Sequence, residues 1–134
     1  MFCDAISFDS DLANWNVSNV IDMNSMFYGA TAFNGNLSRW DVSSVADMNS
    51  MFDGATSFNG DLSIWDVSSV KDMTYMFRSS ISFNQNLCGW KDKFPYDSAS
   101  DIFVASGCTF QSQPRSDEQG PFCASSSCPR TDKR

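Results

Sequence analysis

The stretch LSRWDVSSVADMNSMF, residues 37–52, decides the fold. It recurs as LSIWDVSSVKDMTYMF at positions 62–77 and, with substitutions, as LANWNVSNVIDMNSMF at positions 12–27. The four tryptophans keep the same period, at Trp15, Trp40, Trp65 and Trp90. Self-similarity at a period of roughly 20 to 50 residues is typical of stacked repeats, in which each unit buries its apolar face only against its neighbours. The strictly periodic Trp, Met and Phe residues are therefore expected to form one continuous core.

Each repeat is predicted to hold one strand and one helix. The spacing L-x-x-W-x-V matches the leucine-rich signature L-x-x-L-x-L with Trp and Val in place of Leu. Alternation around Trp65 and Val67 favours a short parallel strand. Ser44 followed by apolar residues at helical spacing favours one or two helical turns, with Asp22, Asp47 and Asp72 as capping residues. The expected fold is an α/β repeat solenoid, a leucine-rich-repeat-like right-handed coil with one short parallel strand and one short helix per 25-residue repeat and a disulfide-tied C-terminal cap.

Three parts are expected along the chain. Residues 1–89 form three and a half coils and start in the middle of a repeat, with Met1 and Phe2 in the place of Met26 and Phe27. Residues 90–128 form a modified last coil, whose pattern is shifted by one residue, and the C-terminal cap. Residues 129–134 form a tail. Because MFCDAISFDS has neither a basic leader nor an apolar stretch, a mature segment or an excised piece is expected.

Composition excludes several classes of function. The 134 residues include 9 basic and 16 acidic ones and no histidine, for a net charge of −7. A nucleic-acid surface would need clustered Lys and Arg, and imidazole-based catalysis or zinc binding would need His. No apolar run approaches the roughly 18 residues that span a bilayer. No enzyme, nucleic-acid partner or membrane span is therefore expected.

Four of the five cysteines cluster near the C-terminus, at Cys88, Cys108, Cys123 and Cys128. Four cysteines allow three pairings; closeness in sequence favours Cys88 with Cys108 and Cys123 with Cys128. Disulfides would indicate an oxidising compartment. A zinc site is disfavoured because the sequence has no C-x-x-C pair. Cys3 is either a free thiol or has lost its partner upstream.

Candidate binding residues lie on the outward side of the predicted strands. One column holds Asn14, Arg39 and Ile64, and the next holds Asn16, Asp41 and Asp66. Stacked about 4.8 Å apart, Asp41 and Asp66 should raise each other's pKa unless a cation or a donor intervenes. They are solvated, bind Ca²⁺, or meet a basic group of a partner. A glycosidase pair is disfavoured, because a flat repeated face has no pocket.

Other asparagines are assigned to structure or to modification. A ladder between coils is expected from Asn34, Asn59 and Asn84, with Asp9 in the first copy. The sequons at Asn16 and Asn36 would accept N-glycans in a eukaryotic secretory route. A glycan at Asn16 would shield the face proposed for binding, so these two hypotheses compete.

The phrases WDVSSVKDMTYMF and FNQNL resemble the BspA-type leucine-rich-repeat family, in particular its branch of 25 to 26-residue repeats in surface proteins and mycoplasmal lipoproteins. The resemblance covers about residues 1–90. It implies surface placement and an adhesive or recognition role, and it implies no catalytic residues.

The sequence thus predicts a noncatalytic extracellular or cell-surface module that presents its repeat surface to a protein or glycan. No cofactor is expected, with Ca²⁺ as the open alternative. The competing hypothesis is a structural spacer or matrix protein that self-associates through its N-terminal coil around Met1 and Phe2.

Overall fold

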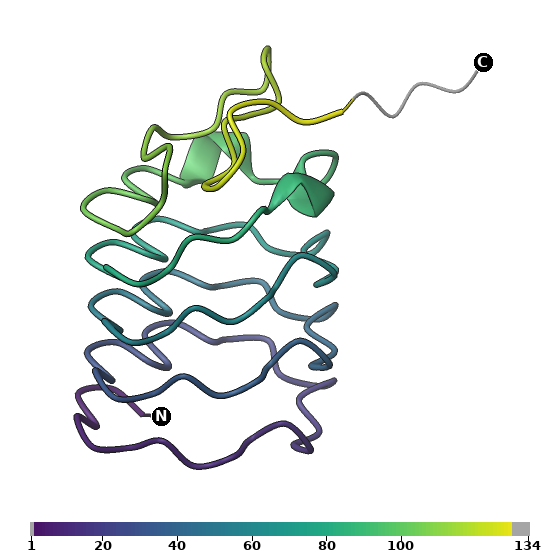
Figure 1. Ribbon diagram of the computed structural model, residues 1–134. Coiled ribbons are helices and arrows are strands. Elements are labelled where there is room, and N and C mark those ends of the chain that lie inside the picture. Colours follow the sequence, from purple (N-terminus) through teal and green to yellow (C-terminus); the bar gives the residue numbers. More distant parts are fainter. Residues whose placement is uncertain (1, 130–134) are drawn as a thin grey trace.

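The computed structural model describes residues 2–129. The chain winds in successive coils stacked one above another, and the C-terminal segment lies over the end opposite the N-terminus (Figure 1). Backbone amides join each coil to the next at a regular step, which becomes one residue longer only at the last coil. The Met23 N–H donates to the Asp47 carbonyl at 2.8 Å, and the Met48 N–H donates to the Asp72 carbonyl at 2.9 Å. Each coil therefore satisfies the polar backbone of the one before it.

The prediction of an α/β repeat solenoid with a strand and a helix in every leucine-rich-repeat-like coil is wrong. Within residues 2–129 the helices are two single 3₁₀ turns, η1 (Cys88–Trp90) and η2 (Tyr96–Ser98). No strand longer than an isolated bridge is present there; the parallel bridges join Asp22 to Asp47 and Asp47 to Asp72. The coils are built of turns.

The segments predicted as helices fail to form helices because their amides bond in two directions. In the first coil the Met26 N–H closes a turn on the Met23 carbonyl at 3.2 Å, while the Phe27 N–H donates across to the Met51 carbonyl at 2.8 Å. An α-helix needs each of these amides for the carbonyl four residues earlier. Ser25 also has φ 57°, a left-handed conformation that a right-handed helix cannot continue through.

The aspartates expected to cap those helices form turns instead. Asp47 Oδ1 accepts the Asn49 N–H at 2.8 Å, and Asp72 Oδ1 accepts the Thr74 N–H at 2.8 Å. A side-chain oxygen that bonds its own backbone two residues on closes an Asx turn. The assignment of Asp22, Asp47 and Asp72 as helix caps is therefore wrong, since Asp22 makes the same bond to Asn24.

The last coil holds one extra residue. The Phe77 N–H donates to the Ile102 carbonyl at 2.9 Å, a step one residue longer than that from Met48 to Asp72. The left-handed positions shift in the same way, since Ser50 and Tyr75 are followed by Asp101. The irregular pattern after Trp90 thus corresponds to a one-residue insertion in an otherwise continued stack.

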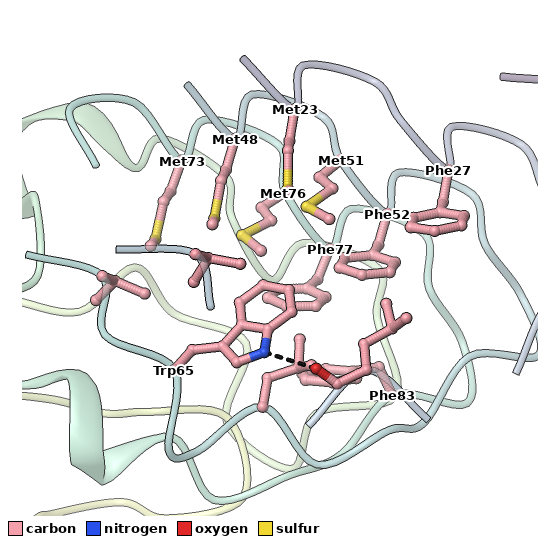
Figure 2. Packing of buried hydrophobic residues seen from close by; sticks show 14 of the residues in the cluster. Met23, Phe27, Met48, Met51, Phe52, Trp65, Met73, Met76, Phe77 and Phe83 are labelled. Atoms are coloured by element: carbon pink, nitrogen blue, oxygen red, sulfur yellow. Dashed lines mark hydrogen bonds between the residues drawn. The ribbon is translucent and has the colours of Figure 1, made fainter. Parts of the chain in front are cut away.

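The core consists of side-chain rows that run along the stack. In Figure 2 Met23, Met48 and Met73 lie in one row and Phe27, Phe52 and Phe77 in another. The centres of the Phe27 and Phe52 rings are 5.3 Å apart, and those of Phe52 and Phe77 are 5.5 Å apart, with nearly parallel planes. These rings are fully buried. Stacking of identical residues between coils is what makes the sequence period stabilising.

The tryptophans add a hydrogen bond between coils. The indole Nε1–H of Trp65 donates to the Leu37 carbonyl at 2.9 Å (Figure 2), and that of Trp40 donates to the Leu12 carbonyl at 2.9 Å. A buried indole N–H needs such an acceptor. Trp therefore serves both as core and as a connector to the preceding coil.

The C-terminal cap is tied by two disulfides, Cys88–Cys128 and Cys108–Cys123. All four predicted cysteines are bonded, but the preferred pairing is wrong. The cap returns across the last coil, with the Phe110 N–H donating to the Cys123 carbonyl and the Ala124 N–H donating to the Gln85 carbonyl. This return places Cys123 beside Cys108, so proximity in space overrides proximity in sequence. Cys3 is an exposed free thiol.

In the part of the chain that the structure describes, no helix has the length and apolar character needed to cross a membrane.

Candidate functional site

The outward columns are the six exposed residues Asn14, Arg39, Ile64, Asn16, Asp41 and Asp66. The first three form the first column and the last three form the second column. Their orientation follows from the residues between and beside them. Trp40 and Val42 are buried on either side of Asp41, and Ile64 is 75% exposed although it precedes the buried Trp65. The alternation that was expected of a strand thus holds these side chains outward in a turn-based coil.

The second column is held in place by Asx turns. Asp41 Oδ1 accepts both the Ser43 N–H at 3.0 Å and the Ser43 hydroxyl at 2.6 Å. Asn16 makes the same pair of bonds with Ser18, and Asp66 Oδ1 accepts the Ser68 N–H at 3.0 Å. One carboxylate oxygen of each aspartate is therefore tied to the scaffold. No residue of 2–129 donates to the other oxygen, which leaves it for an external donor.

The serines also decide the charge of this column. The Ser43 hydroxyl and N–H lower the pKa of Asp41, and this effect exceeds the opposing repulsion from Asp66. The Ser68 hydroxyl and N–H lower the pKa of Asp66, with a further contribution from the positive charge of Lys93. Ser43 and Ser68 are thus the donors that keep Asp41 and Asp66 from raising each other's pKa. Both carboxylates are ionised at neutral pH, and neither has the raised pKa of a general acid.

The sequence reasoning missed Ser43 and Ser68 as functional partners. A signal for them was present, because Asn16-Val-Ser18, Asp41-Val-Ser43 and Asp66-Val-Ser68 repeat one spacing. An Asx residue two positions before a serine is a turn signal.

The first column changes its chemistry at every step. An amide at Asn14 is followed by a guanidinium at Arg39 and an aliphatic side chain at Ile64. Arg39 takes part in none of the ion pairs found among residues 2–129, which are Arg78–Asp53, Lys91–Asp92 and Arg115–Asp117. Its donors are free for a ligand.

The ladder asparagines bond between coils. Asn34 Oδ1 accepts the Asn59 N–H and Asn59 Oδ1 accepts the Asn84 N–H, each at 2.9 Å. The series begins with Asp9, which accepts the Asn34 N–H at 3.1 Å, and ends at the Thr109 N–H. The side-chain oxygens of the ladder residues therefore accept hydrogen bonds from the next coil and serve to join the coils.

The sequon asparagines are exposed and take part in turns of their own. Asn36 Oδ1 accepts the Ser38 N–H at 3.0 Å and the Ser38 hydroxyl at 2.7 Å, as Asn16 does with Ser18. The sequon spacing thus coincides with the Asx turn of the repeat, which accounts for its recurrence.

No group of three or more His, Cys, Asp or Glu residues that could hold a metal ion occurs within the described range. The second column supplies an amide at Asn16 and carboxylates only at Asp41 and Asp66, whereas Ca²⁺ takes six or more oxygen ligands. The Ca²⁺ alternative therefore gains no support from the arrangement.

Two hollows were not expected from the sequence. One of about 500 Å³ lies in the cap between η2 and the returning chain, and is lined by Tyr96, Asp97 and residues 113–117. The other, of about 210 Å³, lies at the N-terminal end of the stack around Trp15, Val20 and Met23.

Comparison with known proteins identifies the repeat region. No curated protein and no solved structure matches the chain. A family model described as "Mycoplasma protein of unknown function, DUF285" matches residues 1–113. The match spans the stacked coils and ends where the cap begins its return. The chain therefore belongs to the DUF285 family of Mycoplasma proteins of unknown function.

Proposed function

We propose that this protein is a noncatalytic extracellular or cell-surface recognition module whose outward columns bind a protein or a glycan. The observation that carries the proposal is the contrast between the two sides of each coil. Buried positions repeat Trp, Val, Met and Phe from coil to coil, while the first column changes from Asn14 to Arg39 to Ile64. A uniform core supports a surface whose chemistry is free to vary.

The chemistry of the columns suits a mixed polar ligand. The second column offers carboxylate acceptors whose position is fixed by Ser43 and Ser68. Arg39 adds a planar donor, and Ile64 adds an exposed apolar contact. Fixed acceptors lower the entropy cost of binding, because the side chains are ordered before the ligand arrives.

Two features favour placement outside the cell. The disulfides Cys88–Cys128 and Cys108–Cys123 are compatible with an oxidising compartment. The resemblance to BspA-type surface proteins supports the same placement and the adhesive role.

The test begins with a screen of glycans and surface proteins, carried out with and without Ca²⁺. The variant Arg39→Ala/Ile64→Ala is then measured on a confirmed ligand, and affinity should fall about tenfold or more. The matched control is Ile81→Ala/Arg115→Ala, which also removes one exposed cation and one exposed apolar side chain. Unchanged affinity in the first variant, or a loss in the control instead, would overturn the assignment of the outward columns.

A further inference from the structure

The C-terminal cap contains a hollow that lies apart from the outward columns. We call the hollow of about 500 Å³ between η2 and residues 113–117 the cap hollow. Its volume is within the range of roughly 300 to 1,000 Å³ that is usual for pockets that bind small molecules. One wall belongs to the last coil and the other to the returning chain, so the hollow exists only because the cap folds back over the stack.

The walls of the cap hollow are held by contacts within the cap. The Tyr96 hydroxyl donates to the Lys91 carbonyl at 2.7 Å, which fixes the tyrosine ring. The Gln113 Nε2–H donates to the Tyr96 carbonyl at 3.3 Å and thereby joins one wall to the other. The disulfide Cys108–Cys123 ties the returning chain to the last coil. A ligand therefore meets walls that are ordered before it arrives, which lowers the entropy cost of binding.

The polar groups of the cap hollow are mainly acceptors. No residue within 2–129 donates to the Asp97 carboxylate or forms an ion pair with it. Asp117 accepts the Arg115 Nε–H at 3.3 Å and an Nη2–H at 3.1 Å, and each of its oxygens keeps a lone pair. The strongest donor of the hollow, the Arg115 guanidinium, is thus already turned to Asp117. An acceptor-rich lining fits a ligand that is rich in hydrogen-bond donors.

Charge and spacing narrow the class of this ligand. Two carboxylates, Asp97 and Asp117, line the hollow against the single guanidinium of Arg115, and this surplus favours a cation. The acceptors lie on both walls, with Asp97 on η2 and Gln113 and Asp117 on the returning chain, so the donors must be distributed over the ligand. A lysine ammonium holds all its donors at one atom, whereas a sugar ring spreads hydroxyls around its edge and can carry an amine.

We propose that the cap hollow binds an amino sugar in its protonated form. The ammonium group pairs with Asp97, and ring hydroxyls donate to Asp117 and to the Gln113 carbonyl oxygen. The C–H face of the sugar packs against the half-buried ring of Tyr96. A neutral sugar of the same size keeps the hydroxyl contacts and loses the ion pair.

This site is independent of the outward columns. A ligand seated in the cap hollow loses affinity in the variant Ile81→Ala/Arg115→Ala, which is the result that excludes the outward columns for that ligand. The failure of either proposal therefore leaves the other standing.

The test titrates glucosamine, at a pH where its amine is protonated, into the isotope-labelled full chain and follows the backbone amides by NMR. Saturable shifts are expected within residues 96–98 and 113–117, with a Kd of about 1 mM. Glucose is expected to bind about fivefold more weakly, since it lacks the partner of an exposed carboxylate. Shifts confined to other parts of the chain, or equal affinity for the two sugars, would overturn the proposal.

The decisive variant is Asp97→Asn, which keeps the shape of the side chain and removes its charge. Glucosamine should then bind about fivefold more weakly, while the affinity for glucose stays within about twofold. Asp101→Asn is the matched control, because Asp101 is an exposed aspartate of the same coil outside the hollow; its preference for glucosamine over glucose should persist. Because the ratio of the two affinities is compared within each variant, a general loss of stability cannot imitate the result.

A shortened chain distinguishes the sugar from the basic end of the protein itself. Residues 130–134 are removed, and the spectrum is compared with that of the full chain. The amides that respond to glucosamine should keep their positions and still respond. If removal of these residues alone shifts the same amides and glucosamine no longer does, the hollow receives the end of this chain and the proposal is overturned.

Discussion

Replacement of Phe58 by alanine tests whether ring stacking between coils stabilises this protein. Phe58 is fully buried in the middle of its row, with ring centres 5.9 Å from Phe33, 4.2 Å from Phe52 and 6.0 Å from Phe83. Phe8 holds the equivalent position at the end of the row. It is half-buried and lies 4.0 Å from Phe2 and 5.8 Å from Phe33. The pair therefore compares one side chain with neighbours on both sides and one with neighbours on a single side.

The expected losses differ because the two sites differ in burial. Phe58→Ala removes a fully buried ring and leaves a cavity between two coils, which costs about 3 to 5 kcal/mol of unfolding free energy. Phe8→Ala removes a partly exposed ring and leaves a site open to water, so a loss of about 1 to 2 kcal/mol is expected. In a stack stabilised by nearest-neighbour contacts, Phe58→Ala must have a lower free energy of unfolding than Phe8→Ala.

The assay is urea unfolding at 25 °C with the disulfides intact, followed by tryptophan fluorescence and circular dichroism, whose transitions should coincide if unfolding is two-state. A Phe58→Ala loss equal to or smaller than the Phe8→Ala loss would refute the reasoning, because stability would then not depend on contacts between coils.

Three other predictions concern the ladder, the second column and the cap. Asn59→Ala should cost about 1 kcal/mol because the Asn84 N–H loses its acceptor, whereas Asn59→Asp should be tolerated, as Asp9 serves in the same position; thermal melting of both variants checks this. Ser43→Ala should raise the pKa of Asp41 toward its ordinary value, as measured by NMR titration. Because the pKa of Asp41 is lowered in the folded state, the ionised carboxylate stabilises the fold above the unfolded pKa of about 3.9. This stabilisation is lost as the pH falls through the lower pKa of the folded state. Ser43→Ala should therefore make the stability of the protein less dependent on pH in this acidic range. Loss of Cys108–Cys123, which closes a loop of 15 residues, should lower the free energy of unfolding by about 3 kcal/mol, and loss of Cys88–Cys128, which closes a loop of 40, by about 4 kcal/mol. Chemical denaturation of variants with both cysteines of one disulfide replaced by serine tests which loss is larger. Peptide mapping that finds Cys88 bound to Cys108 would contradict the pairing.

Much of the candidate site could be predicted from the period alone. Residues one period apart lie in one column, so the side chains of Asn14, Arg39 and Ile64 all face outward whether the coil is made of strands or of turns. The assignment of Trp, Met and Phe to the core holds in the interior coils for the same reason, whereas Trp15 in the first coil is 43% exposed. The two-residue spacing of Asp41 and Ser43 also indicates the Asx turn that lowers the pKa of the aspartate, although the sequence analysis did not identify this turn.

Only the tertiary structure decided where the hydrogen bonds of the backbone go. The segment from Val45 to Phe52 has helical spacing of apolar residues, but its alternate amides donate to the next coil, and local propensity cannot show that a neighbouring carbonyl lies within reach. The disulfide pairing depended likewise on the return of the cap across the last coil, which brings Cys123 to Cys108 and Cys128 to Cys88. The sequence by itself determined the period, the composition of the core and the outward columns, because these need only a repeated step. The replacement of strands and helices by turns follows from contacts between coils that no single repeat contains.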